Sequence, residues 1–171
     1  MHKNAPDDQK VISYKRLSRF LVSFGSTYPS ISPDKGIDGT FCKGELKEYL
    51  NLLSTVSLPA NLRHGIDFGS SYGAAQCLIV ETTGVNMIGF ECNPHRWQLS
   101  QILQGDLVKA SGREPEDPRY LERGSEISHK LHFVEETSQS TEMITTTCMS
   151  LEEEINNISF VFWFSHGWNK E

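Results

Sequence analysis

The stretch Arg63–Glu91, RHGIDFGSSYGAAQCLIVETTGVNMIGFE, decides the fold of this chain. It opens with a short apolar run that carries an acid (66–68), and a turn of small residues (69–73) follows. An apolar, helix-compatible segment (74–81) comes next, and a second apolar run (87–90) again ends in an acid. The order of these pieces predicts strand, glycine turn, helix and strand, which is the first βαβ unit of a parallel α/β sheet.

Three features of this unit predict a ligand that contains a nucleoside. Gly69 and Gly73 lack a Cβ, so the backbone can bend sharply and a ligand can lie against it. The turn leads into a helix N-terminus, whose free N–H groups favour an acceptor-rich ligand. Glu91 follows Gly69 by 22 positions, close to the spacing of roughly 20 residues at which an acid reaches a ribose diol. The alternative, a βαβ unit with an ordinary tight turn, stays open.

The turn reads D-F-G-S-S-Y-G from Asp67 to Gly73. It lacks the G-x-G-x-x-G pattern of dinucleotide-binding oxidoreductases, which disfavours that class. It resembles motif I of the class I S-adenosylmethionine-dependent methyltransferases. The resemblance implies S-adenosyl-L-methionine as the cofactor, with the turn around its methionine part and the acid after the second strand at its ribose hydroxyls. The implied cofactor-binding residues in this unit are Asp67, Gly69, Ser70, Ser71, Gly73 and Glu91.

Two flanking segments narrow the resemblance. The segment Phe41–Leu46, FCKGEL, is similar to the Y-G-E segment that precedes motif I in the non-SET histone-lysine methyltransferases, the disruptor-of-telomeric-silencing family. The segment Ile158–Gly167, ISFVFWFSHG, resembles that family's fourth strand and the loop after it. The similarity covers residues 38–171. It implies a protein lysine as methyl acceptor, in histones or nucleosomes by resemblance alone.

Two more acids are candidates for cofactor contacts. Glu45 matches the acid of the Y-G-E segment, which contacts the cofactor in the resembled family; a first-turn acid favoured by the helix dipole is the alternative. Glu136 follows the predicted third strand (131–134), where an acid of this superfamily can bond the adenine amino group; an exposed loop acid is the alternative.

The chain departs from the family at two places. Ser71 replaces the middle glycine of motif I; if that position needs a positive φ, the change costs on the order of 1 kcal/mol or more. Phe162 and Trp163 stand where the family has two asparagines at the end of strand four. Methyl transfer depends largely on alignment and desolvation, and no residue is an obvious base for a lysine, so no catalytic residue is assigned. A non-catalytic, truncated methyltransferase-like module that binds a partner or only the cofactor is therefore the second hypothesis.

Composition is that of a globular protein, with 37% hydrophobic and 22% charged residues among 171. No apolar run approaches the roughly 20 residues of a membrane span, so no membrane contact is expected. The four cysteines stand far apart without a C-x-x-C pair and predict reduced thiols and no metal site. In the absence of a targeting signal, an intracellular location in nucleus or cytoplasm is expected.

The net charge of −6 argues against a general affinity for phosphate backbones. Basic residues gather only in the segment 10–24, where apolar residues recur at helical spacing. A solvated face of a packed amphipathic helix is favoured there over a nucleic-acid or nucleosome contact. The basic residues are Lys10, Lys15, Arg16 and Arg19.

The fold expected overall is α/β: a partial Rossmann-like parallel sheet of the class I methyltransferase type with flanking helices, preceded by an N-terminal helical segment. Residues 1–39 are expected to form a helix and loop extension, and residues 40–171 the methyltransferase-like domain. Asn93 is expected to cap a helix over 94–110 with Trp97, Ile102, Leu103 and Leu107 buried, and 111–128 to be an exposed excursion. Further helices are expected over 45–56 and 150–156, a loop over 25–39, and a buried strand over 158–164.

The chain ends at Glu171, just past the predicted fourth strand, whereas a complete domain of the superfamily has seven strands. The edge of strand four would then be exposed and apolar. Self-association, a partner, the N-terminal helix or the segment 142–149 is expected to cover it, unless the chain is a fragment.

Overall fold

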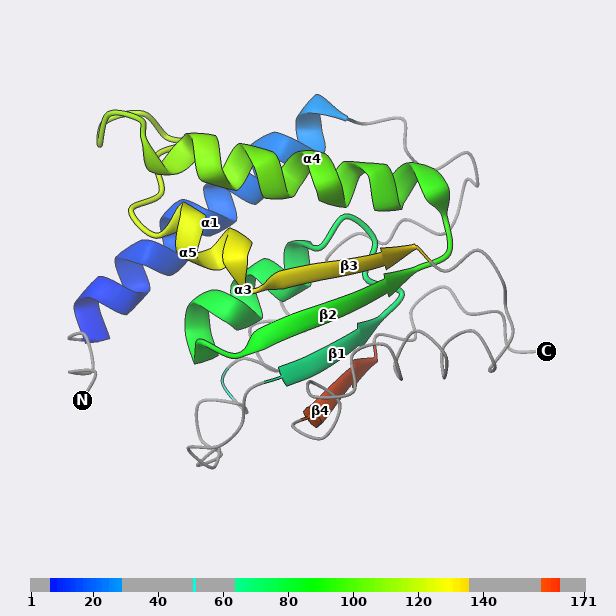
Figure 1. Cartoon of the computed structure of the whole chain (residues 1–171). Coiled ribbons are helices and arrows are strands. Elements are labelled where there is room, and N and C mark those ends of the chain that lie inside the picture. Colours follow the sequence, from blue (N-terminus) through cyan, green and yellow to red (C-terminus); the bar gives the residue numbers. More distant parts are fainter. Residues whose placement is uncertain (1–6, 29–50, 52–63, 136–157, 164–171) are drawn as a thin grey trace.

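A computed structural model describes residues 7–28, 51, 64–135 and 158–163. Within these residues the chain forms four helices and four strands (Figure 1). In chain order they are α1 (Asp7–Thr27), β1 (His64–Phe68), α3 (Ala74–Thr83), β2 (Asn86–Glu91), α4 (Pro94–Ser111), α5 (Gly124–His129), β3 (Leu131–Glu135) and β4 (Ile158–Trp163).

The four strands form one parallel sheet in the order β3-β2-β1-β4. The predicted α/β fold, a parallel sheet with flanking helices, is confirmed. In the sheet, Asp67 of β1 lies in register with Gly89 of β2 on one side and with Phe162 of β4 on the other. The strands β1 and β2 are buried over most of their length, as expected of central strands in a parallel sheet.

The strand order reverses direction at β1. The chain runs outward from β1 through β2 to β3, and β4 then lies on the opposite side of β1. In open parallel sheets a crevice forms outside the carboxyl ends of the strands at such a reversal, and ligands bind there. The turn that follows β1 therefore occupies the position in the sheet at which a ligand is expected.

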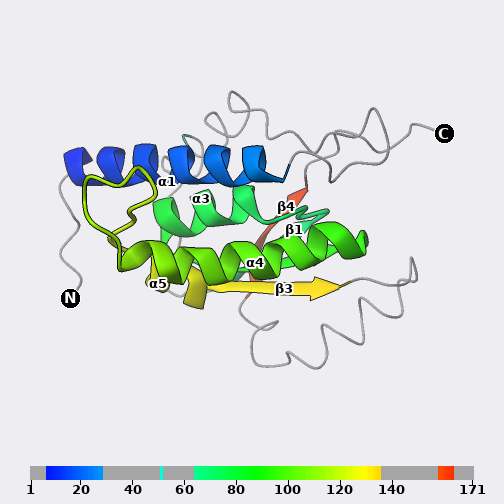
Figure 2. The ribbon, with the colours of Figure 1, turned by 90° about the horizontal axis from the view of Figure 1, so that it is seen from above.

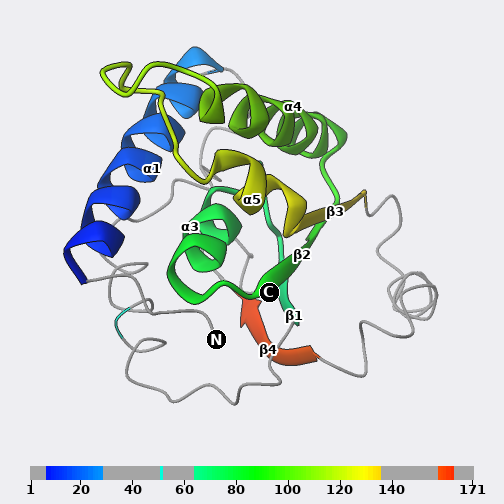
Figure 3. The same ribbon diagram turned by 60° about the vertical axis from the view of Figure 1, so that its left-hand side comes forward.

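The helices gather on one face of the sheet, and α3 lies between α1 and α4 in the view of Figure 2 (Figures 2 and 3). Right-handed crossovers between parallel strands require this placement of α3, α4 and α5. The side chains of α1 enter the same core as those of α3. The buried core includes Leu17, Phe20, Leu21, Phe24, Cys77, Leu78, Ile79, Met87, Leu103, Leu107 and Leu131.

Of the apolar positions at helical spacing on α1, Leu17, Leu21 and Phe24 are buried and Tyr14 is half-buried, as expected of a packed amphipathic helix. The helix continues to Thr27, beyond the expected start of a loop at Gly25. Glu81 of α3 joins α1 to the rest of the fold: its carboxylate accepts a hydrogen bond from Ser13 Oγ and lies 3.7 Å from Arg123 Nη1. The basic face predicted on α1 is partly engaged, since Arg16 lies over the ring of Tyr120 at 5.5 Å.

Two sequence-based expectations about α4 and its successor are wrong. Ile102 is 41% exposed, whereas Leu103 and Leu107 of the predicted stripe are buried as expected and Leu99 is buried with them. The segment 111–128 is not wholly an exposed excursion: its last part begins α5, whose Ile127 is buried. The predicted cap of α4 is confirmed, since Asn93 Oδ1 accepts from the N–H groups of His95 and Arg96.

The expected helices over 45–56 and 150–156 and the segment 142–149 lie outside the described residues, apart from Asn51, which is helical. No helix in the described ranges is both long and apolar enough to cross a membrane. Among the same residues, no three His, Cys, Asp or Glu side chains are grouped in a way that could hold a metal ion.

Candidate functional site

The turn between β1 and α3 is built from three left-handed residues. Gly69 has φ 74°, Ser71 has φ 53° and Gly73 has φ 89°. The N–H groups of Gly69 and Ser70 both donate to the carbonyl of Phe90, at 2.9 and 3.1 Å, which fastens the turn to the end of β2. The glycines at 69 and 73 are therefore required by the backbone itself, since other residues rarely adopt such angles.

Ser71 is the one described non-glycine residue with a positive φ. We expect Ser71→Gly to raise the free energy of unfolding by about 1 kcal/mol, because glycine adopts this conformation without steric cost. Denaturant titration of both proteins measures the change. The bond from the residue 71 N–H is kept in the variant, so an unchanged or lower stability would contradict the assignment of strain to this residue.

Glu91 lies at the turn, as its spacing from Gly69 predicts. Its Oε2 accepts from the N–H of Ser71 at 2.7 Å, and its Oε1 accepts from the N–H of Asn93 at 2.8 Å. The thiol of Cys92 lies 3.9 Å from Oε1. A carboxylate has about four lone-pair directions, so Oε2 can still accept one more hydrogen bond, whereas Oε1 already accepts from Asn93 and, over the longer distance, from the Cys92 thiol. The backbone thus holds Glu91, only 4% exposed, in a single orientation with capacity left for a ligand.

Asp67 is a second buried acid on the same face of the sheet. It is 2% exposed and lies beside Gly89 in the β1–β2 register, where Gln76 and Ser70 fill the space that a side chain on Gly89 would take. Burial raises the pKa of Asp67 well above its usual range, and the negative charge of Glu91 raises it further. The two carboxyl groups therefore resist simultaneous ionisation, and a ligand that offers donors or positive charge would be favoured beside them.

Two buried polar side chains lie close together at the turn: Ser70, which the motif identified, and Gln76 of α3, which it did not. Gln76 is fully buried in α3, and neither its Nε2 nor its Oε1 has a hydrogen-bond partner among the described residues. Ser70 Oγ, in a residue that is 4% exposed, is likewise without one. A Cβ built on Gly89 would lie 2.1 Å from Gln76 Nε2 and 2.7 Å from Ser70 Oγ, so the two groups lie over the same point of β2. In the sequence, only the position of a glutamine within the apolar run AAQCLIV could have indicated a buried polar side chain at Gln76.

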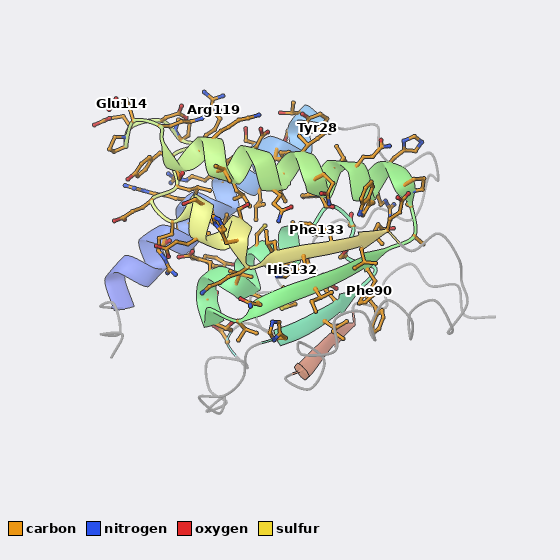
Figure 4. The ribbon with its side chains drawn as sticks, viewed as in Figure 1. Tyr28, Phe90, Glu114, Arg119, His132 and Phe133 are labelled. Carbon is orange, nitrogen blue, oxygen red and sulfur yellow. The ribbon has the colours of Figure 1, made fainter. Side chains whose placement is uncertain are left out.

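Aromatic rings enclose the turn from two elements. Phe133 of β3 lies on the helix side of the sheet against Gly73: a Cβ there would stand 2.5 Å from two of its ring carbons (Figure 4). Tyr72 packs against Phe24 of α1, with ring centroids 5.7 Å apart. The left-handed backbone of the turn is therefore held by contacts to β3 and to α1.

The structure brings together Asp67, Gly69, Ser70, Ser71, Gly73 and Glu91, six of the eight residues that the sequence singled out. Glu45 and Glu136 lie outside the described residues. Glu135, the neighbour of Glu136, stands beside Glu91 in the β2–β3 register and is half-buried. The site as described offers carboxylate acceptors, the N-terminal N–H groups of α3 and a side-chain-poor backbone surface at one edge of the sheet.

The chain was also compared with known proteins. No family model matches it, and neither the curated proteins nor the solved structures include a match.

Proposed function

We propose that this chain binds S-adenosylmethionine at the carboxyl ends of β1 and β2 and is a methyltransferase. The observation that carries the proposal is the Glu91 carboxylate, which two backbone N–H groups orient beside a left-handed, side-chain-poor turn. Its remaining acceptor capacity, at Oε2, suits a ribose hydroxyl. The likeness of the turn and of its flanking segments to the non-SET histone-lysine methyltransferases supports a protein lysine as acceptor.

The residues of the site suit two parts of the proposed cofactor, its ribose and its methionine part. Glu91 would hold the ribose, while the turn 69–73 would lie against the methionine part. Asp67 and the buried hydroxyl of Ser70 add an acid and an unpartnered polar group beneath it. When bound, the cofactor supplies a methyl group attached to a positively charged sulfur, and a neutral amine can take the methyl group by displacing the sulfur. The chain's own residues would orient that group and exclude water from it.

A second candidate function is cofactor binding without methyl transfer. Phe162 and Trp163 of β4 stand in register with Asp67 and Phe68, at the carboxyl end of the sheet. The resembled family carries two amides at the matching positions, and those amides help to frame the cofactor and the path of the lysine. A chain that lacks them can retain affinity for the cofactor and lose the geometry for transfer.

Isothermal titration calorimetry with S-adenosylmethionine and S-adenosylhomocysteine tests the proposal. We expect binding by the full chain and an affinity about tenfold or more lower for Glu91→Ala, since a hydrogen bond to a charged group contributes roughly 1.5–3 kcal/mol. Glu114→Ala is the control for the loss of one negative charge, because this acid is exposed and lies past the end of α4 that is distant from the site (Figure 4). Circular dichroism checks that both variants fold, and Glu91→Gln keeps one oxygen acceptor should Glu91→Ala unfold the turn.

Transfer of a labelled methyl group to histones or nucleosomes separates the two candidate functions. Binding together with transfer supports the methyltransferase, and binding alone supports the non-catalytic module. A folded chain that binds neither ligand overturns both, as does equal loss of affinity in Glu91→Ala and Glu114→Ala.

A further inference from the structure

The C-terminal end of α1 touches the turn at Tyr72. Phe24 packs on the Tyr72 ring and on Tyr28, whose centroid lies 5.0 Å from that of Phe24. One residue further along α1, a Cβ built on Gly25 would lie 3.3 Å from the Tyr72 hydroxyl. The absence of a side chain at position 25 therefore leaves the space that Tyr72 occupies.

Tyr72 stands between two of the three left-handed residues of the turn. Ser71 before it has φ 53° and donates its N–H to Glu91, and Gly73 after it has φ 89° and begins α3. A displacement of the Tyr72 ring changes the backbone on both sides, because neither neighbour can relax into an ordinary conformation without breaking these contacts. The ring is thus connected through one peptide unit to the hydrogen bond that orients Glu91.

A second contact holds α1 in place at its other half. Ser13 donates to the buried carboxylate of Glu81 in α3, and Arg123 approaches the same oxygen. Two well-separated points of α1 are therefore attached to α3 and to the turn that precedes it. The helix is held against the site and does not rest on the core through apolar contacts alone.

We infer that Phe24 and Gly25 of α1 position the turn 69–73 through Tyr72, and so set the orientation of Glu91. These are positioning residues, since neither touches the carboxylate itself. The affinity of the site for a nucleoside ligand then depends on α1, a segment more than forty residues away in the sequence. That last consequence rests on the proposed function, whereas the positioning of the turn does not.

The first experiment compares Phe24→Leu with Phe20→Leu in the full chain. The two phenylalanines are one helical turn apart on α1 and are 6% and 5% exposed, so the substitutions remove similar core contacts. Residue-resolved amide exchange by NMR reads the Ser71 N–H, which is protected by its bond to Glu91. We expect exchange about tenfold faster in Phe24→Leu than in Phe20→Leu, because local opening of the turn becomes easier. Equal exchange in both variants would overturn the inference.

The second experiment uses a substitution that a purely structural role would make favourable. Alanine is a better helix former than glycine, so Gly25→Ala should strengthen α1 itself. We nevertheless expect faster Ser71 exchange and an affinity for S-adenosylhomocysteine lower by about three- to tenfold, because the new methyl group presses on the Tyr72 hydroxyl. Gly25→Ala combined with Tyr72→Phe removes that hydroxyl and is expected to restore both readouts.

The binding and exchange experiments together separate the proposed function from the positioning role of α1. If the wild-type chain binds neither S-adenosyl ligand, the proposed function fails while the exchange data still decide the role of α1. If the wild type binds and Glu91→Ala does not, but Gly25→Ala leaves affinity and exchange unchanged, the positioning role of α1 is refuted and the proposed function stands.

Discussion

Gly73→Ala is expected to lower the free energy of unfolding by about 3 kcal/mol, from a left-handed residue and an overpacked contact together. Gly73 has φ 89°, which alanine adopts only with strain. The new Cβ would also stand 2.5 Å from two carbons of the Phe133 ring, closer than atoms can approach. Because Gly73 begins α3 and ends the turn, the damage falls on the site and on the core together. Denaturant titration measures the loss.

Gly84→Ala separates the two causes. Gly84 ends α3 with φ 72°, yet a Cβ there would meet nothing nearer than Lys130 Nζ at 3.7 Å. Gly84→Ala should therefore lower the free energy of unfolding only by the strain of a left-handed alanine, about 1 kcal/mol. Combining Gly73→Ala with Phe133→Leu should recover part of the difference as a favourable coupling energy. Equal losses at the two glycines, or strict additivity in the double variant, would show that the Phe133 contact has no energetic weight.

Asp67→Asn is expected to stabilise the chain at neutral pH and to do so less as the pH falls. Burial, and then the charge of Glu91, raises the pKa of Asp67 in the folded state above its value in the unfolded chain. Between those two pKa values the native state binds a proton that the unfolded chain has lost. The contribution of Asp67 to stability is therefore fully present at pH below about 4 and declines by up to about 1.4 kcal/mol per pH unit until the folded pKa is reached. Asparagine does not titrate and avoids this decline.

Unfolding free energies of both proteins between pH 4 and 8 give the difference curve. We expect it to rise with pH from the unfolded pKa upward and then level off at the folded pKa. In a Glu91→Gln background the curve should level off at a lower pH, because one cause of the raised pKa of Asp67 has been removed. A difference that does not vary with pH would mean that Asp67 titrates alike in both states. By the proposed function, Asp67→Asn should also weaken the S-adenosyl ligand while it stabilises the fold.

The local chemistry of the turn was readable from the sequence. Glycines at 69 and 73 are needed where the backbone becomes left-handed, and the doubt about Ser71 was justified, since its φ is positive. The acid at 91 could be placed opposite the turn because adjacent parallel strands end at the same edge of a sheet. These inferences depend on short-range rules of backbone conformation and strand alternation, and such rules act within one βαβ unit.

Which face of a helix is buried is harder to predict when the helix carries several apolar residues. Trp97, Ile102, Leu103 and Leu107 make a plausible stripe on α4, but the same segment carries Leu99 and Ala110, and burial of that set leaves Ile102 exposed. Both faces satisfy helical spacing, and the position of the sheet and of α5 selects between them. The burial of Ile127 after a run of charged residues likewise depends on a neighbour that no local pattern reveals.

By itself the sequence determined where the chain bends, that β1 and β2 lie in parallel and which carboxylate returns to the bend, because each of these follows from residues within about thirty positions of one another. Only the tertiary structure decided that Phe133 closes on Gly73, that Gln76 and Ser70 are buried without partners among the described residues, and that α1 reaches Tyr72. Contacts of that kind join elements far apart in the chain, and they are set by how complete side chains fill a shared volume, which neither spacing nor composition encodes.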